Sequence, residues 1–102
     1  MTVHLFTVKD PLGQEVQLTE NCYQFHILVE HPELSDVNKI VETIESPDLI
    51  AQDAVEPQRL VYYRTYQAQP QRWMKVVVEQ GEVVTAYRVR RLKKGETIRW
   101  QR

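Results

Sequence analysis

The spacing of apolar residues changes midway along the chain, and this change constrains the fold more than any other feature. In the first half, apolar side chains recur at helical spacing across 20–31 and 35–46. The second half holds three runs rich in β-branched and aromatic residues, at 59–66, 72–80 and 82–90. The order of these segments predicts two helices followed by a set of strands.

Capping residues set the expected limits of the two helices. Thr19 is a suitable N-cap for the first helix, and Pro32 disfavours helical geometry at His31, so we expect this helix to end there. Ser35 is the expected N-cap of the second helix. The second helix should end at Ser46, because Pro47 follows it.

Turn residues predict how the strands connect. Asp, Pro and Gly in "KDPLGQ" favour a hairpin over residues 3–18, and Gly81 in "EQGE" favours a tight hairpin in the second half. The segment "TIRW" can add a short edge strand. The 102 residues therefore predict a single α+β domain over 1–102. In it, the N-terminal hairpin and two helices pack on one face of a three- to four-stranded antiparallel sheet.

The net charge of −1 conceals a strong separation of charge along the chain. Residues 1–58 carry two basic and eleven acidic side chains, whereas residues 59–102 carry eleven basic and three acidic ones. The halves therefore have net charges near −9 and +8. This separation favours an anionic partner for the second half, although the two halves could also attract each other across one core.

Other features narrow the class of protein. Cys22 is the only cysteine, which excludes an internal disulfide and a cysteine-rich zinc site. No apolar run is long enough to cross a membrane, and "MTVHLFTV" lacks the pattern of a signal peptide. We therefore expect a cytoplasmic protein that has no membrane contact, cofactor or metal.

Two histidines in "HILVEHPEL" suggest different roles. His26 and His31 are five residues apart, about 140° out of phase on a helix, so they cannot bind one metal ion together. His26 fits a helix-surface residue. His31 is expected at the helix C-terminus, where the dipole favours the imidazolium form and so suits acid–base chemistry. A capping histidine that bonds free carbonyl groups is the alternative.

Strand alternation separates the second half into two faces. The face carrying residues 74, 76, 84 and 86 should form the core under the helices. The opposite face then presents Lys75, Thr85 and Tyr87, with the basic run 88–94 beside it. Such a face suits phosphate and base recognition, although it could also be an ordinary solvated face.

The order of the motifs resembles a known group. Five stretches within residues 17–92 resemble the phage-type BECR nuclease-like domains: "LTENCYQFHILVEHPEL", "IVETIESPDLI", "RLVYYRTY", "WMKVVVEQG" and "VVTAYRVRR". That group takes its name from barnase, EndoU and the colicin E-type and RelE-type ribonucleases. The resemblance implies a BECR-like fold and a metal-independent RNA-cleaving or RNA-binding site on an open sheet face.

Site residues follow from the resemblance position by position. His31 would be the acid or base of a 2′-hydroxyl attack on phosphorus, Thr85 and Tyr87 would contact the phosphate or base, and Arg91 would hold the phosphate. The expected substrate-binding residues are Arg64, Lys75, His26 and Arg88.

Three functions remain open at this point. The first is a toxin-like ribonuclease, with RNA as substrate and a protein inhibitor of the antitoxin type as a further partner. The second is a catalytically inactive module that binds RNA or protein with the same sheet. The third is an oligomeric structural protein in which acidic and basic halves pair between chains. The departures "RV" at 88–89 and "NCYQFHI" from the family pattern concern catalysis more than fold.

Overall fold

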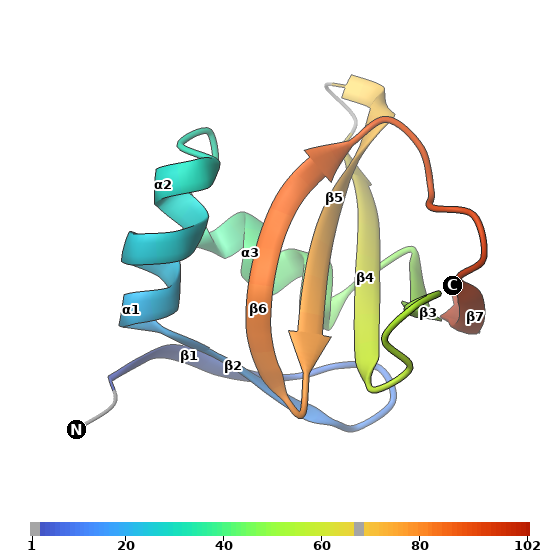
Figure 1. Ribbon diagram of the computed structural model, residues 1–102, viewed down its shortest axis with the longest axis horizontal. Coiled ribbons are helices and arrows are strands. Elements are labelled where there is room, and N and C mark those ends of the chain that lie inside the picture. Colours follow the sequence, from blue (N-terminus) through green and yellow to red (C-terminus); the bar gives the residue numbers. More distant parts are fainter. Residues whose placement is uncertain (1–2, 67–68) are drawn as a thin grey trace.

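A single curled sheet organises the protein. The computed structural model describes residues 3–66 and 69–102, and within them seven strands form one sheet in the order β1-β2-β6-β5-β4-β3-β7. The sheet curls into a half-barrel, with the helices to one side (Figure 1). Its strands are β1 (His4–Lys9), β2 (Glu15–Thr19), β3 (Leu49–Gln52), β4 (Arg59–Tyr66), β5 (Gln69–Glu79), β6 (Glu82–Val89) and β7 (Thr97–Gln101).

The predicted architecture, a hairpin and two helices on one face of a three- to four-stranded BECR-like sheet, is wrong. The hairpin β1–β2 is itself part of the sheet, because β2 pairs with β6 in parallel through Gln17 and Glu82. At the other edge, β3 pairs with both β4 and β7. These pairings join segments that are distant in sequence, and β3 has only four residues, too few to show a periodic pattern.

The first helical segment lies where the sequence predicts it. It consists of α1 (Glu20–Cys22), the π-helical turn η1 (Tyr23–Ile27) and α2 (Leu28–Glu30) in continuous succession. The Thr19 side chain accepts a hydrogen bond from the Cys22 backbone N–H at 3.1 Å, and the helix ends at His31. Both predicted ends are confirmed, whereas the π turn in the middle was not predicted.

The second helix is α3 (Val37–Glu45), and its predicted end at Ser46 is confirmed. Its predicted N-cap is wrong by one residue. Asp36, rather than Ser35, accepts a hydrogen bond from the Asn38 backbone N–H at 3.0 Å. A carboxylate at this position also interacts favourably with the helix dipole, which explains the preference.

The main core lies between the helices and the sheet. Its buried residues come from both helices and most strands: Val16, Leu18, Tyr23, Ile27, Leu34, Ile40, Ile44, Ile50, Tyr62, Met74, Val76, Val78, Val83 and Ala86. Two tyrosine hydroxyls donate hydrogen bonds inside it. Tyr23 donates to the Leu34 carbonyl at 2.7 Å, and Tyr62 donates to the Asp10 carboxylate at 2.5 Å. These bonds satisfy polar atoms that burial would otherwise leave unpaired.

The opposite face of the sheet is not an open surface. Leu49, Ala51, Val61 and Tyr63 form a second buried cluster there, with Trp73 and Val89 packed against it. These four residues are at most 5% exposed. The expectation of an open sheet face that presents Lys75, Thr85 and Tyr87 is therefore wrong at Lys75, which is buried, whereas Thr85 and Tyr87 are partly exposed.

A β-bulge changes which side chains of β6 enter the core. Thr85 pairs with Val77, but Val83 rather than Val84 pairs with Val78, so the register shifts between these pairs. The extra residue reverses the alternation below Thr85. Val83 is 4% exposed and belongs to the main core, in contrast to the prediction for Val84.

The predicted tight hairpin between β5 and β6 is confirmed, and it also anchors β2. Gln80 and Gly81 both have positive φ, at 52° and 77°, as the two central residues of a type I′ turn require. The Gly81 carbonyl accepts a hydrogen bond from the Gln17 backbone N–H at 2.8 Å. A Cβ at Gly81 would lie 3.0 Å from the Glu15 carbonyl oxygen, so the glycine permits this close approach.

Candidate functional site

The helix end and strand β6 meet through two rings. His31 follows α2, and its imidazole stacks on the Tyr87 ring with centroids 5.4 Å apart and an interplanar angle of 24°. The Nδ1 atom of His31 also lies 3.6 Å from a Glu33 carboxylate oxygen. Two of the four residues predicted to be catalytic, His31 and Tyr87, are therefore in contact, although more than fifty positions separate them in the sequence.

A buried ion pair lies beside Tyr87. Lys75 Nζ is 3.3 Å from a Glu96 carboxylate oxygen, and the two side chains are 6% and 4% exposed. The Tyr63 hydroxyl donates a hydrogen bond to the other oxygen of this carboxylate. The ammonium also lies 5.4 Å from the Tyr63 ring centroid and 5.6 Å from that of Tyr87, within cation–π range. The charge of Lys75 is therefore fully compensated within the protein.

Burial and hydrogen bonding set the protonation states of this group. Burial raises the pKa of the Tyr63 hydroxyl, and its bond to Glu96 raises it further, to about 12. Burial alone would lower the pKa of Lys75, but its interactions with Tyr63 and Glu96 outweigh burial and raise it. Near neutral pH, Lys75 is therefore charged and Tyr63 is a neutral hydrogen-bond donor.

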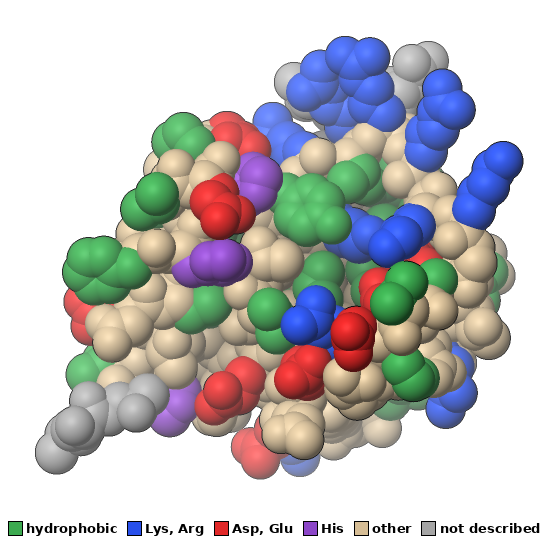
Figure 2. Space-filling model, viewed as in Figure 1, with side chains coloured by type: hydrophobic (Ala, Val, Ile, Leu, Met, Phe, Trp, Pro, Cys, Tyr) green, Lys and Arg blue, Asp and Glu red, His purple; other side chains and the backbone are tan. Residues whose placement is uncertain are grey.

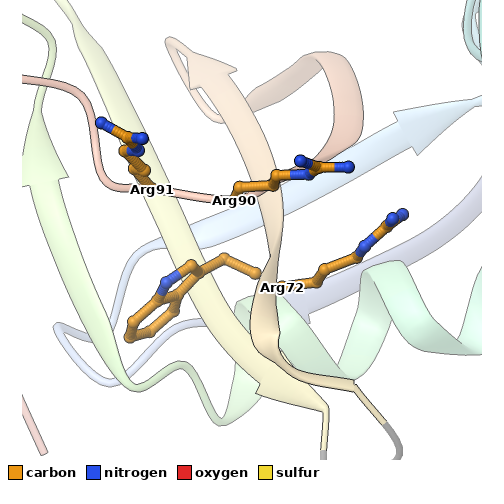
Figure 3. Close-up of a pocket in the computed structure, with 4 residues that line it drawn as sticks. Arg72, Arg90 and Arg91 are labelled. Carbon is orange, nitrogen blue, oxygen red and sulfur yellow. The ribbon is translucent and has the colours of Figure 1, made fainter.

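A pocket lies at the far end of the same strands. Arg72, Trp73, Arg90 and Arg91 line it, and its volume is about 620 Å³. Figure 3 shows Arg72 and Arg90 extending in the same direction, with Arg91 directed to the other side. The Trp73 ring meets the Tyr63 ring edge to face, with centroids 6.2 Å apart at 83°. This contact holds the indole in place. It also connects the pocket to the buried Lys75–Glu96 ion pair, because Tyr63 donates a hydrogen bond to Glu96.

The basic end consists of five exposed cations. Three of them line the pocket and two follow closely in the chain: Arg72, Arg90 and Arg91, then Lys93 and Lys94. Figure 2 shows lysine and arginine side chains gathered at the top and right of the molecule, over the start of β5 and the chain that follows β6. Within residues 3–66 and 69–102, none of these five forms an ion pair or side-chain hydrogen bond. Lys93 acts electrostatically on Asp53, whose pKa it helps to lower, but the three pocket arginines have no acidic partner among the described residues.

The remaining predicted site residues lie in separate places. Arg91 lines the pocket, and Thr85 lies on β6 opposite Val77. Arg64 donates a hydrogen bond to the Ser46 carbonyl at the end of α3. His26 is on the outer surface of the first helical segment, 3.9 Å from the Glu30 carboxylate.

Two further residues predicted to bind substrate, Lys75 and Arg88, lie on opposite faces of the sheet. Lys75 pairs with Tyr87, and the next pair along the strands joins Met74 and Arg88.

Sequence reasoning missed four residues that define the site: Arg72, Trp73, Arg90 and Glu96. Arg90 lies within the basic run 88–94, but its neighbour across the sheet, Arg72, could be found only from the register of β5 and β6. Glu96 is one of three acidic residues in a basic half, and this rarity was the available signal.

The described residues contain neither a metal-binding cluster nor a membrane-spanning helix. Among the described residues, no group of three or more histidine, cysteine, aspartate or glutamate side chains could hold a metal ion. No helix in the same part of the chain is long and apolar enough to span a bilayer.

Comparison with known proteins adds no relative. No family model matches the chain, and neither a curated protein nor a solved structure matches it. The fold and the site therefore define the protein only by class. It has a curled, mixed α and β domain with a cationic, tryptophan-lined pocket at the end of the antiparallel strands β5 and β6.

Proposed function

We propose that the protein binds single-stranded nucleic acid at the basic end, with RNA as the ligand that the sequence analysis favours. One observation carries this proposal: three arginines and a tryptophan line a single pocket of about 620 Å³. None of the three guanidinium groups has an acidic partner among the described residues. The volume lies within the range of ordinary small-ligand pockets, so a nucleotide unit is of suitable size.

The residue types match the two parts of a nucleotide. Guanidinium groups bind phosphate oxygens through paired N–H donors, and the Trp73 indole offers a surface on which a base can stack. Stacking of one base on an aromatic side chain contributes about 1–3 kcal/mol. A base inside a duplex cannot reach such a surface, so the proposal favours single strands.

Fluorescence anisotropy with labelled oligonucleotides tests the proposal. Single-stranded RNA and DNA should bind, and a duplex of the same sequence should bind more weakly. Affinity should fall as salt rises, with a slope of about −0.7 for each phosphate neutralised. If single strands and duplexes bind equally weakly at low salt, the proposal is wrong.

Matched variants locate the binding surface. Trp73→Ala should weaken binding about 5- to 150-fold, as expected from the loss of one stacked base, and Trp73→Tyr should restore much of it. Arg99→Ala is the control, because Arg99 is exposed on β7 and donates a hydrogen bond to Gln52 at 3.0 Å, away from the pocket. An equal loss with Arg99→Ala would contradict the assignment to this pocket.

Metal-independent RNA cleavage is a second candidate, favoured by the contact between His31 and Tyr87. An imidazole at a helix end is a suitable acid or base for 2′-hydroxyl attack. Against it, the nearby Lys75 ammonium is already paired with Glu96 and is therefore less available to a phosphate. Incubation of bound RNA in EDTA, followed by gel analysis, separates the candidates. Cleavage that disappears in His31→Ala would favour the ribonuclease, and intact RNA at every pH would exclude it.

A further inference from the structure

Three arginines lie on one face at the open end of the sheet. Arg88 pairs with Met74, which belongs to the main core, so Arg88 lies on the helix-facing side of the sheet. Arg72 precedes Met74 by two residues on β5, so alternation places it on the same side. Arg90 directly follows β6, and Figure 3 shows it extending in the same direction as Arg72. Same-face neighbours along a strand are about 6.6–7 Å apart, close enough for long side chains to reach one anion.

Arg88 carries a buried donor that nothing in the described residues satisfies. Its Nε atom is buried and lacks a hydrogen-bond partner. Buried donors in folded proteins are nearly always paired, and an unpaired one is unfavourable. The neighbouring arginine on β4 is different, because Arg64 donates to the Ser46 carbonyl. Arg88 does not line the pocket itself, but its side chain is partly exposed, and Arg90 two residues later does line it. A ligand acceptor beside Arg90 would therefore lie within reach of the Arg88 guanidinium.

The number of guanidinium groups exceeds what one internal phosphodiester requires. A phosphodiester in a nucleic-acid chain carries one negative charge, whereas a terminal phosphomonoester carries about −1.5 to −2 at pH 7 and offers three strong acceptor oxygens. Arg72, Arg88 and Arg90 together supply three positive charges without an acidic partner in the described chain.

We propose that Arg72, Arg88 and Arg90 form a subsite for the terminal phosphomonoester of a nucleic-acid strand. This inference rests on the proposed function and adds to it which part of the ligand the pocket recognises. The terminal phosphate lies on the helix-facing side with the three arginines, and the first base stacks on Trp73, on the other side of the strand end. Figure 3 shows the shared direction of Arg72 and Arg90 on which this placement depends.

Isothermal titration with one oligonucleotide sequence in three forms tests the subsite. The forms carry a 5′-phosphate, a 3′-phosphate, or hydroxyl groups at both ends. One phosphorylated form should bind about tenfold more tightly than the hydroxyl form, as one to two additional charge-assisted hydrogen bonds predict. The ratio should fall as pH decreases through about 6, where the phosphomonoester takes up a proton. Equal affinity of all three forms would overturn the inference while leaving nucleic-acid binding intact, whereas no binding of any form would refute both.

Variants and a competing ligand show whether these arginines recognise the terminal phosphate. Arg88→Ala should abolish the preference, so that the phosphorylated and hydroxyl forms bind with about the same affinity. Arg91→Ala, on the other side of the strand end, should weaken both forms by the same factor and keep the preference. Arg88→Met retains the apolar stem if Arg88→Ala does not fold, and it should give the same loss of preference. Inorganic phosphate should displace the phosphorylated form at concentrations that leave the hydroxyl form bound. If the preference survives in the Arg88 variants, the assignment is wrong.

Discussion

Two cationic regions share strands β5 and β6 but differ in how their charge is compensated. In the middle of the sheet, Lys75 is buried, paired with Glu96 at 3.3 Å, and enclosed by two tyrosine rings. At the end of the sheet, Arg72, Arg90 and Arg91 line an open pocket without an acidic partner among the described residues. The first region has the properties of a structural element, and the second has those of a binding site. Uncompensated charge at a pocket, rather than charge alone, therefore selects the candidate site.

The same comparison explains why the sheet face predicted from sequence does not act as a unit. Lys75 and Tyr87 lie on that face as expected. The positive charge of Lys75 is already paired with Glu96, so it is less available to bind a substrate phosphate. Glu96 belongs to the segment between β6 and β7, which also carries Lys93 and Lys94. The ion pair thus attaches this basic segment to the sheet beside the pocket.

The largest expected effect is on the ion pair. Glu96→Gln keeps an acceptor for the Tyr63 hydroxyl but leaves the Lys75 charge buried and unpaired, and should lower the free energy of unfolding by about 3 kcal/mol. Urea denaturation measures the loss. Adding Lys75→Met should recover most of it, because the buried charge is then absent.

The matched control for Glu96→Gln is Glu79→Gln. It removes the same charge from a pair in which Arg59 Nε lies 2.9 Å from Glu79 and both side chains are about one-third exposed, at 36% and 34%. Solvent already screens this pair, so the loss should be much smaller. Similar losses in the two variants would show that burial of the Lys75–Glu96 pair has no special importance.

High pH should weaken the same region. The pKa of Tyr63 is about 12 in the folded protein, above its ordinary value of about 10, so the folded state binds more protons between these values. Stability that is complete below about pH 10 is therefore lost as pH rises toward 12, by on the order of 2 kcal/mol from Tyr63. Burial and the bond to Asp10 raise the pKa of Tyr62 too, and act in the same direction.

Urea midpoints at successive pH values between 8 and 12 test this prediction. Tyr63→Phe should be less sensitive to alkaline pH than the original protein, because the phenylalanine has no proton to lose. The remaining sensitivity belongs to Tyr62 and Lys75. An unchanged pH profile in Tyr63→Phe would contradict the prediction.

The contact between His31 and Tyr87 should have a smaller effect. His31→Ala removes a stacked ring pair and should lower the free energy of unfolding by about 1 kcal/mol. Thermal unfolding measures the change, and Tyr87→Leu should give a larger loss, because it removes both this contact and the cation–π contact with Lys75. A double variant that loses clearly less than the sum of the two single losses would confirm that the rings interact.

The smallest effect on stability should come from the pocket itself. Arg72→Ala and Arg90→Ala should each change the free energy of unfolding by no more than about 0.5 kcal/mol, because neither side chain has a charged partner to lose. Each should nevertheless weaken binding of single-stranded RNA and reduce the salt slope by about 0.7. A large loss of stability without a loss of binding would reverse the proposed difference between the two regions.

The sequence by itself determined the local elements of this protein. Thr19 caps the first helical segment, Pro32 limits it, and Gly81 permits the tight turn between β5 and β6. The concentration of basic residues after position 58 also followed from the sequence alone. Each of these features depends on interactions between residues close together in the chain, so spacing and residue type suffice to predict them.

Only the tertiary structure decided how these elements combine. The parallel pairing of β2 with β6, the pairing of β3 with β7, and the bulge beside Val83 produced a seven-stranded curled sheet in place of the predicted smaller one. The tertiary fold also brought Glu96 to Lys75, and the register of β5 and β6 set Arg72 beside Arg90. These contacts join residues far apart in sequence, and their register depends on the packing of the entire sheet. Local periodicity in the sequence does not determine that register, so the candidate site could be found only from the three-dimensional structure.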